Sequence, residues 1–205
     1  KEKREERTVQ AREPFWKNVK KLDGQLKLYL LVTFLFTLGN SSNAFLLLRA
    51  KSVGFDGTSV ILLYFLYNVS ASLLAIPMGK RSDRVGRKRL LVTGYFVFAA
   101  VYLGFAFALD KVTMIGFFLL YGLYTAMITG VERAFIAEIS PPGLKGTMLG
   151  LQSTVMGVAL LPASAVAGVL WDAFGAWVPF VFGACMSLVA AVLLLVFMKG
   201  GQRTV

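Results

Sequence analysis

Glu132 directly follows an uncharged run, residues 112–131, and ends a stripe of polar side chains in that run. The stripe repeats at intervals of four and three residues, so its members share one face of a helix: Tyr121, Thr125, Thr129 and Glu132. A carboxyl group in apolar surroundings can take up and release a proton as its access to water changes. Two interpretations are open. Glu132 loads a proton, or it forms a structural ion pair with groups near Arg133 or in the basic segment 80–89.

Amide and hydroxyl side chains also gather in an earlier uncharged run, residues 28–48. Four of them follow one another at spacings of four or three residues: Thr33, Thr37, Asn40 and Asn43. They either line a water-filled cavity that holds a solute or form hydrogen bonds with neighbouring helices. Tyr64 and Asn68 share a helix face in the same way, and packing with one interhelical hydrogen bond is the simpler interpretation of that pair.

Six uncharged runs carry these side chains and must position them. Of the 205 residues, 57% are hydrophobic and 16% are charged, whereas soluble domains are about 45–50% apolar and about a quarter charged. Each run has 20 to 26 residues, and about 20 apolar residues let a helix cross a bilayer. The strict alternation of barrel strands is absent. The sequence therefore predicts an all-α integral membrane protein with six transmembrane helices, over residues 28–48, 57–79, 90–109, 112–131, 146–171 and 173–198.

The basic residues are distributed unevenly between the two sides of the predicted bundle. The net charge is +11, and of the 22 lysines and arginines only Arg49, Lys51 and Lys111 fall on the side opposite the N-terminus. This asymmetry follows the positive-inside rule and predicts a multi-pass protein of the plasma (inner) membrane with both termini in the cytoplasm. Nucleic-acid binding is disfavoured, because it would need a basic face on a folded soluble domain.

Residues that could support catalysis are missing from the sequence. Histidine is absent, and the only cysteine, Cys185, lies inside the last uncharged run, where it is expected to pack. No nucleotide-binding loop, metal-ligand cluster or nucleophile arrangement is present. The sequence therefore predicts a protein that is not an enzyme and has no cofactor and no metal site.

The two ends of the chain flank the bundle, which we expect to cover residues 26–199. Residues 1–25 are predicted to be a cytoplasmic linker, and residues 200–205 a cytoplasmic tail. Apolar residues in the linker recur at helical spacing, with a tryptophan beside them, which indicates an amphipathic helix on the inner membrane face; they are Phe15, Trp16, Val19, Leu22 and Leu26. Because the chain begins with Lys1, we expect a fragment or a processed product.

The basic segment between the second and third runs, residues 79–89, reads G-K-R-S-D-R-V-G-R-K-R. Gly79 and Gly86 would allow a tight turn between two antiparallel helices. Asp83 is the only acid in the segment, and it can pair with an arginine or accept hydrogen bonds from the N-terminus of another helix.

This segment resembles the signature loop of the major facilitator superfamily, G-x-x-x-D-R-x-G-R-[KR]. The matching positions are Gly79, Asp83, Arg84, Gly86, Arg87 and Lys88. The linker and the stretches 138–150 and 168–175 are similar to segments of the C-terminal half of such proteins. The resemblance implies one half of that fold, helices seven to twelve. The polar first and fourth spans and the nearly apolar third and sixth fit a three-plus-three inverted repeat.

The resemblance implies a secondary active transporter that moves a small solute by alternating access. Its partners would be the lipid bilayer, an N-terminal six-helix half or a second copy of this chain, and a small-molecule substrate, with a proton if Glu132 loads one. The Asp83 carboxylate would brace the inward gate against the other half. Two alternatives stay open, a half-size homodimeric transporter and a non-transporting membrane domain that binds or scaffolds another molecule. Substrate-cavity candidates are Thr37, Asn40, Asn43, Tyr64, Asn68, Tyr121 and Thr125.

Overall fold

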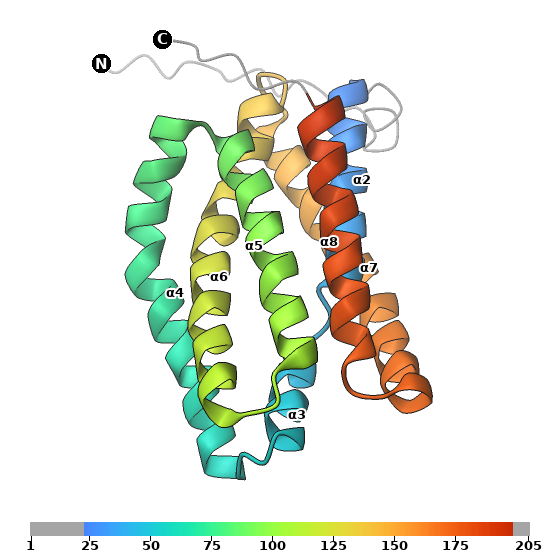
Figure 1. Ribbon diagram of the computed structural model, residues 1–205. Coiled ribbons are helices and arrows are strands. Elements are labelled where there is room, and N and C mark those ends of the chain that lie inside the picture. Colours follow the sequence, from blue (N-terminus) through green and yellow to red (C-terminus); the bar gives the residue numbers. More distant parts are fainter. Residues whose placement is uncertain (1–22, 199–205) are drawn as a thin grey trace, which may run out of the picture.

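The computed structural model describes residues 23–198, and this part of the chain is a bundle of helices without strands (Figure 1). Six stretches are long and apolar enough to cross a membrane, the first of them made of two helices in sequence. The predicted all-α membrane fold with six spans is confirmed. The predicted linker helix, apart from Leu26, and the tail lie outside the described residues. The helices are α2 (Gly24–Gly39), α3 (Ala44–Ser52), α4 (Gly57–Val85), α5 (Arg87–Phe107), α6 (Lys111–Ile139), α7 (Lys145–Phe174) and α8 (Val178–Phe197).

The packing partners of the helices reveal the repeat. The span α2–α3 corresponds to α6, α4 corresponds to α7, and α5 corresponds to α8. When each helix is replaced by its counterpart, the α2–α7 pair becomes the α6–α4 pair, and the α2–α8 pair becomes the α6–α5 pair. The α5–α8 pair is unchanged. All of these pairs are in contact. Because each triplet has an odd number of spans, equivalent helices run in opposite directions. The contacts therefore have the pattern of the three-plus-three inverted repeat.

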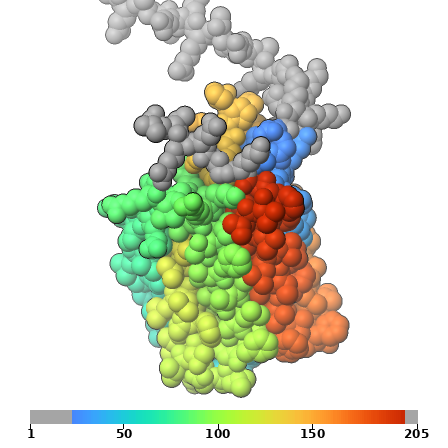
Figure 2. All heavy atoms as spheres, turned by 45° about the horizontal axis from the view of Figure 1, so that its top comes forward, coloured from blue at the N-terminus to red at the C-terminus, as the bar shows by residue number. Residues whose placement is uncertain are grey.

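The third and second spans of the triplets have different surroundings. Among the described spans α5 has the largest share of buried residues, because it packs along both α6 and α8. The space-filling view shows side chains of α5 closing against α8 on one face of the bundle (Figure 2). The middle spans α4 and α7 are the least buried, and each contains a proline, Pro77 and Pro162.

The first span is broken, which the apolar run 28–48 did not predict. The α2 helix ends at Gly39, α3 begins at Ala44, and residues 40–43 are not helical. The α3 helix continues to Ser52, so Arg49 and Lys51 lie on a helix and not in a connecting loop. Non-helical backbone at membrane depth is tolerated only where protein groups or a water-filled cavity surround it. The backbone N–H of Asn40 still has hydrogen-bond partners, since it donates to the backbone carbonyls of Phe36 and Thr37.

The segment 79–89 is almost entirely helical, in contrast to the loop expected from sequence. Gly79 lies inside α4, and only Gly86 leaves helical geometry between α4 and α5. Gly86 has a φ of 102°, a conformation that residues with a Cβ rarely adopt, so it makes the turn. We call the end of the bundle that carries this turn and residues 140–144 the loop end, and the other the far end.

Side chains complete the helix termini. At the far end the Asp56 and Asp110 carboxylates accept hydrogen bonds from the first turns of α4 and α6. The hydrogen bonds from Ser59 and Thr113 lower the pKa of Asp56 and of Asp110, respectively. At the loop end α6 continues past the predicted span 112–131 and stops at Ile139, before the Pro141-Pro142 pair, which cannot continue a helix.

A cationic side chain closes the C-terminal end of α5. The Arg49 guanidinium donates to the carbonyls of Phe105, Ala106 and Ala108 over 2.8 to 3.0 Å. A cation is favourable at the negative end of a helix dipole, and these carbonyls lack partners within the helix. Arg49 thereby ties α3 to α5 at the far end.

Two glycines bring α2 and α8 into close contact beside the break in the first span. A Cβ on Gly39 would lie 2.7 Å from Met186 Cβ and 2.9 Å from the Gly183 carbonyl oxygen. Three glycines of α7, in contrast, have open space beside them. A Cβ on Gly146, Gly150 or Gly157 would meet no atom within 4 Å.

We predict that Gly183→Ala destabilises the protein by about 1–3 kcal/mol, because its Cβ would overlap the Gly39 carbonyl and lie 2.7 Å from the Tyr102 ring. The measurement is the free energy of unfolding of the purified complete protein in detergent. The control is Gly116→Ala, at a helical position where a Cβ meets nothing within 4 Å. Equal stability of the two variants would contradict the predicted overlap.

Candidate functional site

Each of the two asparagines that flank the break in the first span lies between two tyrosine hydroxyls. Asn40 Nδ2 donates to Tyr124 at 3.2 Å, and Asn40 Oδ1 accepts from Tyr102 at 3.3 Å. Asn43 Nδ2 donates to Tyr67 at 3.1 Å, and Asn43 Oδ1 accepts from Tyr121 at 2.9 Å. Each amide thus uses a donor and an acceptor within the bundle. Both asparagines therefore form hydrogen bonds between helices, and Asn40 also lines a cavity.

The two candidates on α4 lie apart from this network. Tyr64 is 40% exposed and packs edge-on against Tyr67, with ring centroids 5.0 Å apart. Asn68 Nδ2 donates 2.7 Å to the Tyr64 carbonyl of its own helix. Tyr64 therefore contacts the network through the ring of Tyr67, while Asn68 is exposed on the surface of α4.

Glu132 is buried, with 5% of its surface exposed, in a chain of hydrogen bonds nearer the loop end. Tyr95 of α5 donates to Glu132 Oε1 at 3.2 Å, and Tyr29 of α2 donates to the Glu132 backbone carbonyl at 3.2 Å. Gln152 of α7 donates to the Tyr29 hydroxyl at 3.4 Å. Among residues 23–198 the nearby Thr33 hydroxyl is the buried side-chain polar atom without a hydrogen-bond partner. Four helices therefore meet at Glu132.

A cavity of about 310 Å³ opens beside Glu132, between α2, α6 and α7. We call it the central cavity. It brings together Thr37, Asn40, Glu132 and Arg133 of the sequence-derived candidates. Its other walls are largely apolar or neutral. The full lining is Phe36, Thr37, Asn40, Tyr124, Ile128, Thr129, Glu132, Arg133, Gln152, Ser153, Met156, Gly157 and Leu160.

A second cavity, of about 470 Å³, lies between α4 and α6 and reaches the loop end. Thr125 borders this cavity together with Gly79, Asp83 and Arg87. Thr125 is therefore grouped with the signature residues, although it shares a polar stripe with Glu132. Most of the remaining lining side chains are small, among them Ala71, Ser72, Ala75 and Gly130.

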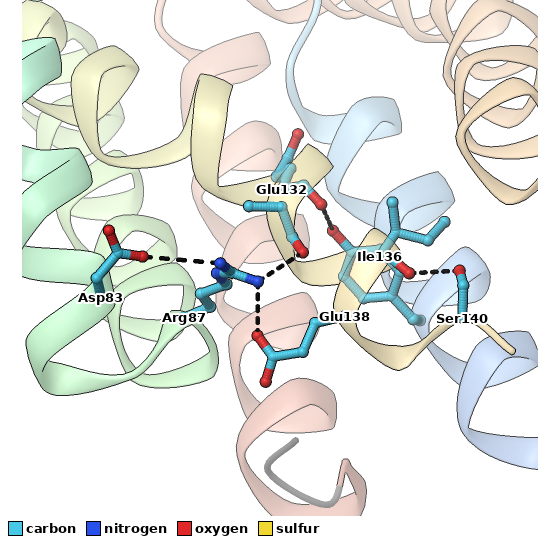
Figure 3. Close-up of polar contacts among 8 residues, drawn as sticks. Asp83, Arg87, Glu132, Ile136, Glu138 and Ser140 are labelled. Atoms are coloured by element: carbon cyan, nitrogen blue, oxygen red, sulfur yellow. Dashed lines mark hydrogen bonds and ion pairs between the residues drawn. The ribbon is translucent and has the colours of Figure 1, made fainter. Parts of the chain in front are cut away.

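Arg87 links three elements at the loop end. Figure 3 shows its guanidinium between the carboxylates of Asp83 and Glu138, at 3.7 and 2.9 Å. It also donates to the Ala134 carbonyl at 3.1 Å. The acid that pairs with the signature segment is Glu138, whereas the ion pairs among residues 23–198 do not include Glu132.

The other signature residues have separate contacts. Lys88 Nζ donates to the carbonyls of Leu195, at 3.0 Å, and Met198, and so completes the C-terminal end of α8. Arg84 is exposed in the last turn of α4. The signature segment therefore anchors α5 to α4, α6 and α8.

Sequence reasoning missed most partners of the candidate residues. Tyr95 and Tyr102 lie seven residues apart, and so on one face, in a nearly apolar run, and Gln152 is the lone amide of the fifth uncharged run, residues 146–171. Isolated polar groups of this kind need partners inside a membrane. That signal points to them, but it does not identify the partner. Within residues 23–198 no group of three or more acidic, histidine or cysteine side chains could hold a metal ion.

Six membrane-spanning helices in an inverted repeat, with a buried carboxyl beside a cavity and a motif-bearing turn, define a half-bundle of the transporter type. The sequence model of the Major Facilitator Superfamily matches residues 29–204, and the chain belongs to this superfamily. The resemblance seen in residues 79–89 is thereby confirmed.

Curated relatives agree with this assignment. An MFS-type transporter of Methanocaldococcus jannaschii is 37% identical over 183 residues, which cover 86% of this chain and 46% of that protein. Multidrug resistance protein 1 of Bacillus subtilis is 26% identical over 72% of this chain and 38% of its own length. The class H tetracycline resistance protein of Pasteurella multocida is 29% identical over 67% of this chain and 34% of its own length. The chain thus spans half or less of each of these relatives.

We predict that Asn40→Ala lowers the free energy of unfolding by about 1 kcal/mol, because it removes two interhelical hydrogen bonds of about 0.6 kcal/mol each. The measurement is unfolding of the purified complete protein in detergent. The matched control is Asn68→Ala, which removes a bond within one helix on the exposed face of α4 and should change stability little. A loss at Asn68 as large as that at Asn40 would refute the interhelical role.

Proposed function

We propose that this chain is the C-terminal half of a secondary transporter that moves a small solute across the plasma membrane by alternating access. The observation that carries the proposal is the central cavity, which is lined by Asn40 at the break in the first span and by the buried carboxyl of Glu132. The loop end would face the cytoplasm, as the basic residues indicate. Membership of the superfamily and the names of the relatives support transport as the activity.

The partner surface would be a second six-helix half. The least buried spans, α4 and α7, border the two cavities, and a Cβ on Gly146, Gly150 or Gly157 of α7 would meet no atom of the described residues within 4 Å. Small residues let helices approach closely, so they suit packing against another membrane half. The M. jannaschii relative is about twice as long as the matched region. Its remaining length would suffice for a second six-helix half in the same polypeptide.

Glu132 would load the coupling proton. Arg87 already pairs with Glu138 at the loop end, which favours the proton-loading interpretation of Glu132 over the ion-pair interpretation. A carboxyl that lines a cavity and is otherwise enclosed can exchange a proton only on the side where the cavity meets water. Alternation of that access would couple proton movement to solute movement.

We predict that Glu132→Gln uncouples transport from the proton gradient. The complete protein would be reconstituted into vesicles with an imposed pH gradient, and a panel of labelled solutes beginning with tetracycline would be followed. The wild-type protein should accumulate a solute against its gradient. The variant should retain solute exchange and lose gradient-driven accumulation, since Gln cannot carry the proton.

Two results would contradict this proposal. Unchanged gradient-driven accumulation in Glu132→Gln would remove the coupling role of the carboxyl. Absence of flux for every solute in the panel, with correctly folded complete protein, would favour the non-transporting binding or scaffold domain.

Asp83 would brace the closed inner gate against the other half. Its side chain is 71% exposed, and its contact with Arg87 is a loose 3.7 Å, so the carboxylate has room for a second partner. The second cavity reaches it from the α4–α6 side. A helix N-terminus from the other half would supply favourable partial positive charge there.

We predict that Asp83→Asn slows solute exchange while the dissociation constant for the transported solute stays close to the wild-type value. The reason is that the charge acts on the gate and not on the solute. The measurement compares exchange rates in vesicles with equilibrium binding in detergent. Asp172→Asn, at an exposed acid near the far end of α7, is the control and should leave both values unchanged. Equal losses of binding and exchange in Asp83→Asn would argue against the gating role.

A further inference from the structure

The surroundings of Glu132 contain few groups that can compensate a negative charge. The titratable side chains that face it are Tyr29 from α2, Tyr95 from α5 and Tyr124 from its own helix. Arg133 follows it in sequence, lines the same cavity and places a positive charge beside it, although Arg133 is exposed and the two side chains form no ion pair within 4.0 Å. From α7 the neutral side chains of Gln152, which bonds Tyr29, and Ser153 line the same cavity.

Of these groups, Tyr95 makes the hydrogen bond to the carboxylate itself. Its hydroxyl donates to Glu132 Oε1, while Tyr29 bonds the backbone carbonyl of the same residue. A hydroxyl donor stabilises a carboxylate more than it stabilises the neutral acid, because the bond to a charged acceptor is stronger. The Tyr95 hydroxyl therefore acts directly on the balance between the two forms of Glu132.

Packing fixes the Tyr95 hydroxyl in place. The side chain is fully buried, and its ring stacks on Phe36 with centroids 4.2 Å apart and planes 16° apart. Ser187 of α8 donates to the Tyr95 backbone carbonyl at 2.8 Å. Tyr95 thus approaches the carboxylate from the buried side of α6, and α2, α6 and α7 form the cavity side.

We propose that Tyr95 is a positioning residue that sets the pH at which Glu132 exchanges its proton. This inference rests on the proposed function of Glu132. The Tyr95 hydroxyl donates to the carboxylate when the proton has left, and so favours release. Proton uptake from the cavity weakens that hydrogen bond, since the carbonyl oxygen of a neutral acid is a poorer acceptor.

The test is a pH titration of the purified complete protein, followed by the infrared band of the protonated carboxyl group. The Glu132→Gln difference spectrum assigns the band, so no transported solute is needed. In Tyr95→Phe the band should persist to a pH about one unit higher than in the wild-type protein, the size expected for loss of a hydrogen bond to a charged group. Phe keeps the ring that stacks on Phe36, and thermal unfolding of the variant checks that it is folded.

The matched control is Tyr102→Phe, which removes a hydroxyl from the same helix that bonds Asn40 and not Glu132. It should titrate as the wild-type protein does. Unshifted titration of Tyr95→Phe, with the Glu132 band present, would overturn the role of Tyr95 and leave proton coupling intact. Equal shifts in both variants would also overturn it, because a general loosening of the bundle would then be the cause. If no band belongs to Glu132 at any pH, the role of Tyr95 is overturned as well, and vesicle transport by Glu132→Gln decides separately whether coupling fails with it.

Discussion

The need to satisfy polar groups at the break in the first span constrains the rest of this half-bundle. Asn40 and Asn43 meet that need with four tyrosine hydroxyls, supplied by α4, α5 and α6. Three helices are therefore held around one junction. The contact of Gly39 with Gly183 brings α8 to the same level, and Arg49 fixes the short helix beyond the break.

The α6 helix connects this junction with the two polar sites nearer the loop end. Along one helix, Tyr121 and Tyr124 bond the asparagines, Glu132 borders the central cavity, and Glu138 pairs with Arg87. Interhelical polar contacts thus follow α6 through much of its length. The break, the carboxyl and the signature segment therefore share one helix. Rotation or translation of α6 would disturb all three sites together.

Much of the fold could be predicted from the sequence, because charged residues separate the apolar runs and the signature segment identifies the second and third spans. The break could not be predicted, since residues 40–43 lie in a run whose length already suffices for one helix. The partners of Glu132 and of the asparagines could not be predicted either, because they come from several helices whose relative rotation the sequence does not specify. Glu132 and Glu138 lie on the same helix, and the packing of α5 against α6 determines which of them Arg87 reaches.

The contacts of α8 have a consequence for the order in which the bundle can be completed during synthesis. The α8 helix is the last of the six described spans, yet it packs along both α5 and α2, which precede it in the sequence. Among the described residues the acceptors of the Lys88 ammonium are the carbonyls of Leu195 and Met198, at the end of that helix. Until α8 is inserted, one side of α2 and of α5 has no covering helix from this half.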